Sequence, residues 1–340
     1  MGQKRVFETV VCPATRQNPR NSEADIIELR DGRLLLAYTD FYNYSLHDMS
    51  PARISGKTSA DFGKTWSEPF TIQENIGTES VMESDLLRLK SGEIVLFFCC
   101  KNSEADCKPY MRKSFDEGKS WSELLAIAKF HSGYFTVNND RAVQLSSGRL
   151  LLPSATTINA WAFNEFVSVC FFSDDNGRTW FRSKDCVSLP NSLGGAQEPG
   201  VVELKDGRIL MWLRSSFGFM YRSYSEDGGE TWGSPESMNV VSPRSAQNIK
   251  RDPSTGNLVL VWNNTTGSRR NPLTMAVSRD EGETWKNVKN IEIDDRFSYS
   301  YPSLTFIKDL ILLTYYVEDE KDLLVHLKLK AIPVDWLYKK

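Results

Sequence analysis

Six stretches of the chain share one hydrophobic pattern. In each, an apolar run leads into a short turn containing Gly, Asp or Ser, and a second, more apolar run follows. Two such runs joined by a tight turn are typical of a β-hairpin. The pattern therefore predicts six β-hairpins, at residues 29–36, 89–96, 145–152, 204–211, 254–260 and 307–313.

A second pattern, Ser-x-Asp-x-Gly-x-Thr/Ser-Trp, occurs between the hairpins. Successive copies begin 55, 59, 52 and 53 residues apart, a period typical of the blades of a β-propeller. The five copies stand at residues 59–66, 114–121, 173–180, 225–232 and 278–285.

The residue types of this phrase predict a self-stabilised turn. An Asp side chain can accept hydrogen bonds from the amides of its own turn, and Gly tolerates the positive φ that such a turn requires. The Trp is a large apolar group that can pack between sheets. Because catalysis needs one site and the phrase occurs five times, we interpret it as structural.

Together the two patterns predict an all-β fold: a six-bladed β-propeller of four-stranded antiparallel blades in a single domain, residues 1–340. The sixth unit, from residue 302 onward, runs out of chain before its outer strand. Residues 5–12 have strand character, and we expect this N-terminal strand to complete the last blade. Such closure would cover edges that otherwise invite aggregation.

Composition narrows the range of partners. A net charge of −3 argues against a nucleic-acid-binding face, and no apolar run reaches membrane-spanning length. Six scattered cysteines and the lack of an apolar leader predict a cytoplasmic protein with reduced thiols, or a secreted one if a leader has been removed. The three histidines lack metal-ligand spacing and no nucleotide-binding loop is present, so we expect no metal and no cofactor.

Propellers bind ligands on the central axis, where loops enter the innermost strands. Several arginines in those positions could hold a carboxylate through paired hydrogen bonds, although each could instead pair with a carboxylate of its own blade. The candidates are Arg20, Glu23 and Asp25 in the first unit, Asp48 on its following loop, Arg141 in the third unit, Glu198 and Arg214 in the fourth, Arg244 and Arg270 in the fifth, and Tyr299 and Tyr301 in the sixth. Tyr299 and Tyr301 alternate along a strand, and we favour Tyr301 as the one facing the axis.

The five Asp boxes and this ordered set of polar residues resemble the sialidase (neuraminidase) superfamily, in particular its bacterial Asp-box repeat branch. The likeness includes the strand end Met211-Trp-Leu-Arg214 and the strand start Tyr301-Pro-Ser-Leu304. The resemblance implies that Arg20, Arg214 and Arg270 grip the carboxylate of a sugar, with Arg269 a competitor for the third place. It implies Tyr301 as nucleophile, Glu198 as its partner and Asp48 as acid/base, while Arg244, Arg141, Glu23, Asp25 and Tyr299 are further substrate-binding candidates.

The chemistry supports this assignment independently. A sugar whose anomeric carbon carries a carboxylate would repel a carboxylate nucleophile, so a neutral phenol is better suited to attack it. Tyr301 must then lose its proton, and Glu198 could accept it. With Asp48 first protonating the leaving oxygen and then activating water, the result is a retaining double displacement.

The sequence departs from the family where the first blade opens. The family has Arg-Ile-Pro, whereas this chain reads Arg20-Asn-Ser-Glu23-Ala-Asp25. Glu23 and Asp25 could form salt bridges with the arginines or recognise a different substrate. The main hypothesis is a sialidase-like exo-glycosidase acting on a terminal acidic sugar. The alternatives are a glycosidase for another acidic sugar and a non-catalytic carbohydrate-binding or scaffold propeller.

Overall fold

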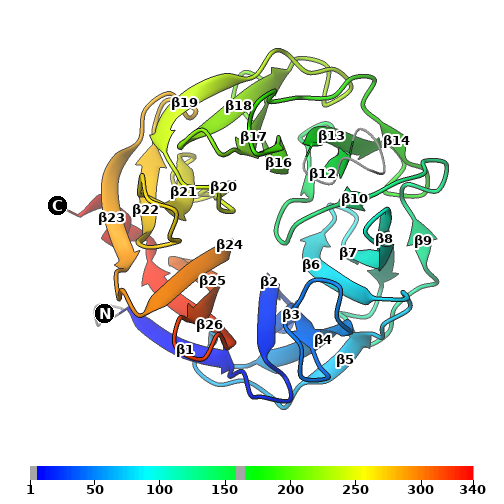
Figure 1. The fold of residues 1–340 in the computed structure, drawn as a ribbon, viewed down its shortest axis with the longest axis vertical. Helices are drawn as coiled ribbons and strands as arrows, with labels where there is room; N and C mark the ends of the chain where they lie inside the picture. Colours follow the sequence, from blue (N-terminus) through cyan, green and yellow to red (C-terminus); the bar gives the residue numbers. More distant parts are fainter. Residues whose placement is uncertain (1–5, 158–164, 340) are drawn as a thin grey trace.

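The computed structural model describes residues 6–157 and 165–339, and its sheets are arranged around a central axis (Figure 1). Within those residues every regular element is a β-strand, apart from the short 3-10 helix η1 (Val334–Tyr338). The all-β prediction is therefore confirmed. No helix in the described ranges is long and apolar enough to cross a membrane.

Three sheets have the predicted four strands, in sequential order. The first contains β6 (Ser80–Arg88), β7 (Ile94–Ser103), β8 (Asp106–Ser114) and β9 (Leu125–Ala126). The second contains β16 (Gln197–Glu203), β17 (Ile209–Arg214), β18 (Phe219–Ser225) and β19 (Glu236–Val241). The third contains β20 (Asn248–Arg251), β21 (Leu258–Asn263), β22 (Leu273–Ser278) and β23 (Lys286–Glu292).

The two remaining sheets are larger than predicted. One has six strands: β10 (Phe135–Thr136), β11 (Val143–Gln144), β12 (Leu150–Thr157), β13 (Glu165–Ser173), β14 (Phe181–Arg182) and β15 (Gly194–Gly195). The other has eight: β1 (Phe7–Cys12), β2 (Arg20–Glu28), β3 (Leu34–Phe41), β4 (Ala52–Ser59), β5 (Phe70–Gln73), β24 (Phe297–Ile307), β25 (Leu310–Asp319) and β26 (Val325–Pro333). In this sheet β2 to β5 form one half, and β1 with β24 to β26 form the other. One parallel pair, Arg20 with Val325, joins the two halves. The first and last units that the sequence pattern predicts are therefore parts of a single sheet.

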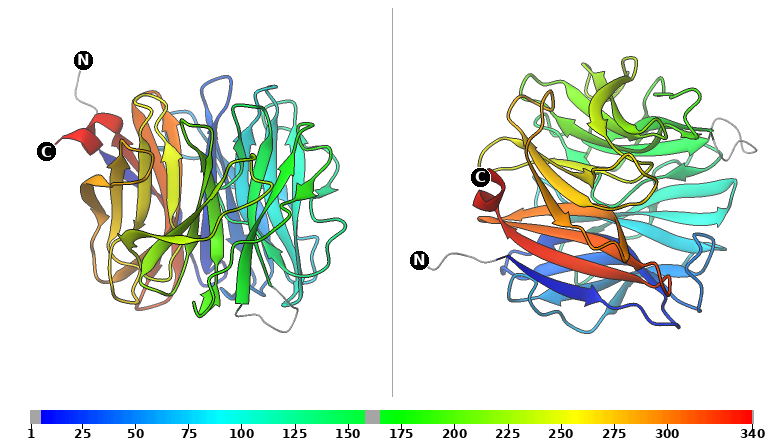
Figure 2. Two further views of the ribbon diagram at one scale, coloured as in Figure 1. Left: turned by 90° about the horizontal axis from the view of Figure 1, so that it is seen from above. Right: turned by 60° about the vertical axis from the view of Figure 1, so that its left-hand side comes forward.

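The first strand lies beside the last one, as Figure 2 shows. β1 pairs antiparallel with β26 from Phe7 opposite Ala331 to Cys12 opposite Leu327. Just beyond it, the amide of Ala14 donates a hydrogen bond to Nδ1 of His326 at 2.9 Å. The predicted start of this strand, Arg5, lies outside the described residues.

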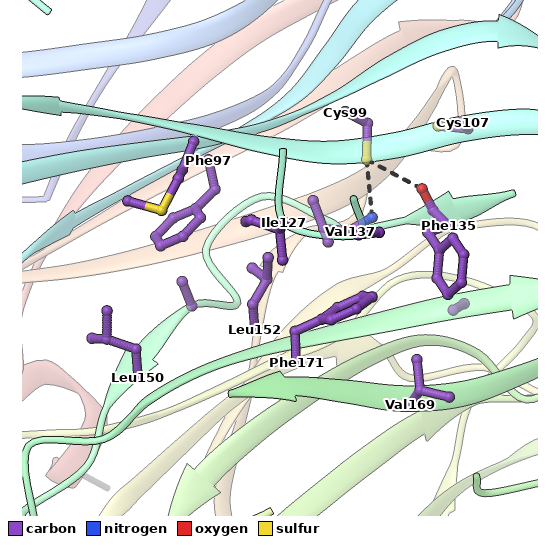
Figure 3. Close-up of a cluster of buried hydrophobic side chains, with 14 of the residues drawn as sticks. Phe97, Cys99, Cys107, Ile127, Phe135, Val137, Leu150, Leu152, Val169 and Phe171 are labelled. Atoms are coloured by element: carbon purple, nitrogen blue, oxygen red, sulfur yellow. Dashed lines mark hydrogen bonds between the residues drawn. The ribbon is translucent and has the colours of Figure 1, made fainter. Parts of the chain in front are cut away.

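The sheets pack face to face through their apolar side chains. Figure 3 shows one such cluster, in which Phe97 and Cys99 of β7 meet Leu152 and Phe171 of the next sheet. The neighbouring Cys100 lies in a different cluster, on the other face of β7. This alternation buries both faces of the sheet, because each is covered by a neighbour around the axis.

The five Asp boxes form the predicted turns between third and fourth strands. In the first box, Asp61 accepts hydrogen bonds from Ser59, from the amide of Thr65 and from the hydroxyl of Thr65 at 2.7–2.9 Å. Gly63 has a φ of 89°, and Trp66 donates from its indole nitrogen to the Gly63 carbonyl. The same Ser–Asp and Asp–Thr/Ser bonds recur in the other four copies. The Ser, Asp and Thr/Ser side chains of these turns therefore form their hydrogen bonds within the turn.

Candidate active site

A cavity of about 360 Å³ lies where the inner strands converge, and it is lined by side chains of four sheets and of the loops that precede β20 and β22. Eight of the predicted site residues line it: Arg20, Glu23, Asp48, Glu198, Arg214, Arg244, Arg270 and Tyr301. Residues that are far apart in sequence therefore meet at one place, as the sequence prediction required.

Four of the inner strands turn a side chain into this cavity through the same local backbone conformation, a positive φ. Glu23, Glu83, Glu198 and Tyr301 have φ values of 43°, 66°, 45° and 52°. Each stands at a point where the strand shifts register against its neighbour. A left-handed conformation costs a non-glycine residue about 1–2 kcal/mol. Strain at four equivalent positions around a cavity points to function rather than to stability.

Tyr301 and Glu198 are directly hydrogen-bonded. The Tyr301 hydroxyl donates to Oε1 of Glu198 at 2.8 Å, and Nη1 of Arg214 donates to the same oxygen at 2.5 Å. Burial and then the negative charge of Glu198 raise the pKa of Tyr301 well above its ordinary value. Burial also opposes ionisation of Glu198, but Arg214 and Arg270 outweigh it and lower the Glu198 pKa. The resting pair is thus a protonated phenol beside an ionised carboxylate.

Arg270 and Arg244 flank this pair. The guanidinium of Arg270 lies 5.7 Å from the centre of the Tyr301 ring and donates a hydrogen bond to the Tyr316 hydroxyl. Arg244 is exposed on the loop between β19 and β20. Burial and then the positive charges of Arg214 and Arg270 lower the pKa of Arg244. The three guanidinium groups are therefore near enough for their charges to repel one another.

Arg20 lies on another side of the cavity and is fully engaged by acidic and hydroxyl groups. Its Nη1 donates to Oδ1 of Asp48 at 2.5 Å, its Nη2 to Oε1 of Glu23 at 2.6 Å and its Nε to Oγ of Ser22 at 2.9 Å. The Asp48 side chain is 59% exposed. Burial opposes ionisation of Asp48, but the charges of Arg20 and Lys101 outweigh it and hold the Asp48 pKa below its ordinary value.

Three predicted substrate-binding residues do not line this cavity. Asp25 is buried below it and accepts hydrogen bonds from the amide of Leu86 and the hydroxyl of Ser303, which ties three inner strands together. Arg141 is buried and donates to the Gln247 carbonyl.

Tyr299 is the third of these residues. It is buried in an apolar cluster against Tyr315. Residues two apart on a regular strand share a face, so alternation alone would not separate the two tyrosines. The register shift after Ser300 and the positive φ of Tyr301 turn Tyr301 to a different side. Arg269, the competitor of Arg270, also lies outside the cavity lining and instead pairs with Glu320 at the surface.

Sequence reasoning missed Glu83. Thr136 donates its hydroxyl proton toward the Glu83 carboxylate, with both oxygens at 2.7 Å. Burial raises the pKa of Glu83 to about 7, although Lys101 opposes the shift. A signal was present: Glu83 stands six residues before Leu89, the same spacing as Glu23 before Leu29 and Glu198 before Leu204.

The site contains hydrogen-bond donors that suit an anion rather than a cluster of side chains that suit a metal ion. Within residues 6–157 and 165–339, no group of three or more His, Cys, Asp and Glu side chains is placed to hold a metal ion. What the arrangement offers is a protonated phenol with a proton acceptor, several guanidinium groups and an exposed carboxylate on a loop.

Comparison with known proteins identifies the family of the chain. Residues 54–313, more than half of the chain, match the family described as BNR repeat-like domain. The chain belongs to this family, and with it to the sialidase superfamily.

Individual relatives are more distant. The sialidase of Clostridium perfringens is 27% identical over 240 residues, which cover 63% of this chain and 60% of that protein. The sialidase of Micromonospora viridifaciens is 28% identical over 315 residues, covering 82% of this chain and 47% of the relative. The chain thus spans less than two thirds of the length of each.

Among solved structures, the sialidase of Trypanosoma rangeli in complex with sialic acid superposes with a TM-score of 0.77. The match covers 99% of this chain and 60% of that one at 14% identity, and it supports the fold alone.

Proposed function

We propose that the chain is a sialidase-like exo-glycosidase that hydrolyses a terminal acidic sugar with retention of configuration. The observation that carries this proposal is the hydrogen bond from the Tyr301 phenol to an ionised Glu198 in a cavity lined by arginines. The relatives named as sialidases and the sialic acid bound to the Trypanosoma rangeli protein support the choice of sugar.

In the first step, the Tyr301 oxygen bonds to the anomeric carbon as the bond to the leaving oxygen breaks. The phenolic proton passes to Glu198, which already accepts a hydrogen bond from it. Asp48 gives a proton to the leaving oxygen. In the second step, water attacks the anomeric carbon, Asp48 takes the proton of that water, and Glu198 returns its proton to the departing phenolate.

The ion pair with Arg20 confers a pH dependence on the first step. Because Arg20 lowers the pKa of Asp48, protonated Asp48 becomes populated only at a pH below the range in which an ordinary aspartate gains its proton. We expect hydrolysis of glycosides with poor leaving groups to increase as the pH decreases, whereas aryl glycosides need this proton less. A pH–rate profile of kcat/KM for both substrate types tests the expectation.

The decisive assay is release of a fluorophore from an aryl sialoside, with neutral aryl glycosides for comparison. Tyr301→Phe should lower the rate with this substrate at least about 100-fold, and Asp48→Ala should do so with a glycoside whose leaving group is poor, since positioned nucleophiles and proton donors contribute that much or more. Tyr224→Phe is the matched control, because this tyrosine lies at the surface with Glu283. NMR of the first anomer released tests retention. Wild-type rates in Tyr301→Phe would refute the assignment.

A second candidate is a glycosidase for a different acidic sugar, and Glu23 favours it. This carboxylate lines the cavity in the first unit, where the family sequence has Arg-Ile-Pro. A panel of aryl glycosides of other acidic sugars distinguishes the two. Ligand binding without turnover of any member of the panel would instead indicate a carbohydrate-binding protein.

The sheet arrangement fits a six-bladed β-propeller in a single domain, which we propose as the scaffold. The six predicted hairpins are present within the described residues. Strands of neighbouring units contact one another: β2 with β6 and β24, and β16 with β12 and β20. Dividing the eight-stranded sheet at the single Arg20–Val325 pair yields two four-stranded units, one of which includes β1.

A further inference from the structure

Two neighbouring sheets have very short outer strands, and a groove lies between them. β9 and β14 contain two residues each, whereas β19 and β23 contain six and seven. Both short strands lie at the outer rim of the molecule, away from the central axis (Figure 1). The groove that they flank, called here the rim groove, has a volume of about 960 Å³. Among the described residues, none lines both the rim groove and the central cavity.

The rim groove carries apolar side chains that the fold leaves uncovered. Phe130, Phe181 and Leu124 line it, and Phe130 is 89% exposed, more than any other large apolar residue that the structure describes. The Phe181 side chain is 58% exposed. Single exposed apolar side chains are ordinary, but several that share one concave surface are typical of an interaction site.

Phe181 is also an exception to the sequence repeat. It directly follows the Trp of the third Asp box. The residues at the same place after the other four boxes are Ser67, Ser122, Gly233 and Lys286. The turn therefore folds without an aromatic side chain at this position. An exposed Phe that the repeat does not require points to a role outside its own sheet.

The charged groups of the rim groove have one sign. Four cationic side chains line it, and no Asp or Glu does so within residues 6–157 and 165–339. The four are Lys129, Arg178, Arg182 and Lys184. Lys184 pairs with Glu230 at 3.1 Å, whereas the other three form no ion pair with a described carboxylate. Burial and then the positive charge of Arg182 lower the pKa of His131, which also lines the groove. In a chain whose net charge is −3, this local excess favours an anionic partner.

We propose that the rim groove binds a short acidic segment of another protein, with an aromatic or aliphatic side chain of that segment packed against Phe130 and Phe181. Carboxylates of the segment pair with Arg178 and Arg182. Aromatic and arginine side chains are the residue types that contribute most to binding at protein interfaces. Because the rim groove and the central cavity share no lining residue among those described, this binding is independent of glycoside hydrolysis.

Hydrogen-bonding capacity favours a peptide over a sugar. The Lys and Arg side chains of the groove are donors only, whereas sugar hydroxyls need acceptors as well as donors. Two hydroxyl groups of the lining are already engaged, since Thr179 donates to Asp175 and Ser183 to the Asp185 carbonyl. A carboxylate is an acceptor only and therefore complements the groove. A concave surface between two sheets also suits a narrow segment better than a lipid bilayer.

The repeat itself supplies a variant that removes the chemistry of the groove and keeps the turn. After the Trp, the first and second Asp boxes continue with Ser-Glu at residues 67–68 and 122–123, whereas the third continues with Phe181-Arg182. Phe181→Ser/Arg182→Glu therefore introduces residues that the same turn accepts elsewhere. The matched control is Phe115→Ser/Lys119→Glu, because both residues are exposed on the second Asp box and neither lines the groove.

A random library of peptides about 12 residues long, which reach at most about 40 Å, is selected against the immobilised wild-type protein. The selected peptides should carry several carboxylates and an aromatic or aliphatic residue. In fluorescence anisotropy, the best of them should bind Phe181→Ser/Arg182→Glu at least about 10-fold more weakly and should bind the control variant as it binds the wild type. Added salt should weaken wild-type binding, because exposed charges are screened.

Thermal unfolding of each variant shows whether a loss of affinity comes from the groove or from loss of the fold. If Phe181→Ser/Arg182→Glu unfolds, Lys129→Gln/Arg178→Gln is the second variant. Both of its residues are exposed and form no ion pair with the described chain. Removing these two charges alone should weaken binding of the same peptide about 3-fold or more.

The proposal is overturned if the selected peptides are neutral or basic, or if they bind the variants as well as they bind the wild type. Failure to enrich any peptide over a surface without protein also overturns it. Heparin and vesicles of equal parts phosphatidylcholine and phosphatidylserine are the remaining probes. If either binds the wild type and not Phe181→Ser/Arg182→Glu, while no peptide does, the groove recognises a polysaccharide or a membrane and the proposal is wrong.

Discussion

The ion pair between Glu198 and Arg214 allows a quantitative test of how strongly opposite charges in the cavity stabilise the folded protein. The two side chains are 11% and 8% exposed, and their atoms are 2.5 Å apart. Removing one partner of a buried pair leaves the other charge without compensation and typically costs 3–5 kcal/mol. Because this pair borders a cavity, we expect the lower end, about 3 kcal/mol of unfolding free energy for Glu198→Gln and about 3 kcal/mol for Arg214→Met.

The double variant Glu198→Gln/Arg214→Met should lose less than either single variant, about 1 kcal/mol or below, because neither charge is then stranded. Urea unfolding of the four proteins at pH 7 yields the coupling energy. The matched control is Arg222 with Glu236, a pair whose carboxylate side chain is 56% exposed. Its coupling should not exceed about 1 kcal/mol. Additive losses at Glu198 and Arg214 would show that the cavity is solvated well enough to screen the pair.

Two further predictions concern the scaffold. Gly200→Ala should destabilise the protein by about 3 kcal/mol, because an added Cβ would lie 2.0 Å from a ring carbon of Trp212. Gly267→Ala, where the nearest atom is 3.5 Å away, should be nearly neutral, and equal effects in thermal unfolding would contradict this account. In the Asp boxes, Asp227→Ala removes hydrogen bonds from Ser225 and Thr231 and should cost about 1 kcal/mol after screening by solvent. Hydrogen bonds from Thr231 and Ser225, against an opposing effect of burial, lower the pKa of Asp227 to about 2. The stabilisation is therefore complete above the unfolded pKa of about 3.9 and is lost as the pH falls toward 2. A difference between variant and wild type that persists below pH 2 would contradict this cause.

The features that sequence predicted best are local. A hairpin such as 29–36 needs only its own turn and its apolar runs, and the Asp box satisfies its polar groups within eight residues. Tyr301 and Glu198 were also found, because each opens an inner strand at a fixed distance from a recognisable hairpin. Such spacing carries three-dimensional information, since every unit places its first strand at the axis.

Predicted site residues lie outside the cavity lining where the partner of a side chain is chosen by tertiary structure. Arg141 is as polar in sequence as Arg214, yet it lies on the connection between β10 and β11, where its side chain donates to the Gln247 carbonyl and does not line the cavity. Asp25 ties neighbouring strands together and does not face a ligand. The engagement of Arg20 by Asp48 could not be foreseen either, because it depends on how a loop 28 residues away folds back over the first strand.

The pairing of β1 with β26 also has a consequence for biosynthesis. β1 is synthesised long before β26, its hydrogen-bonding partner. Until then both edges remain open, and the partly made chain is at its most vulnerable to capture by another chain. Synthesis of β26, rather than assembly of any other sheet, therefore determines when these edges are closed against pairing with another chain.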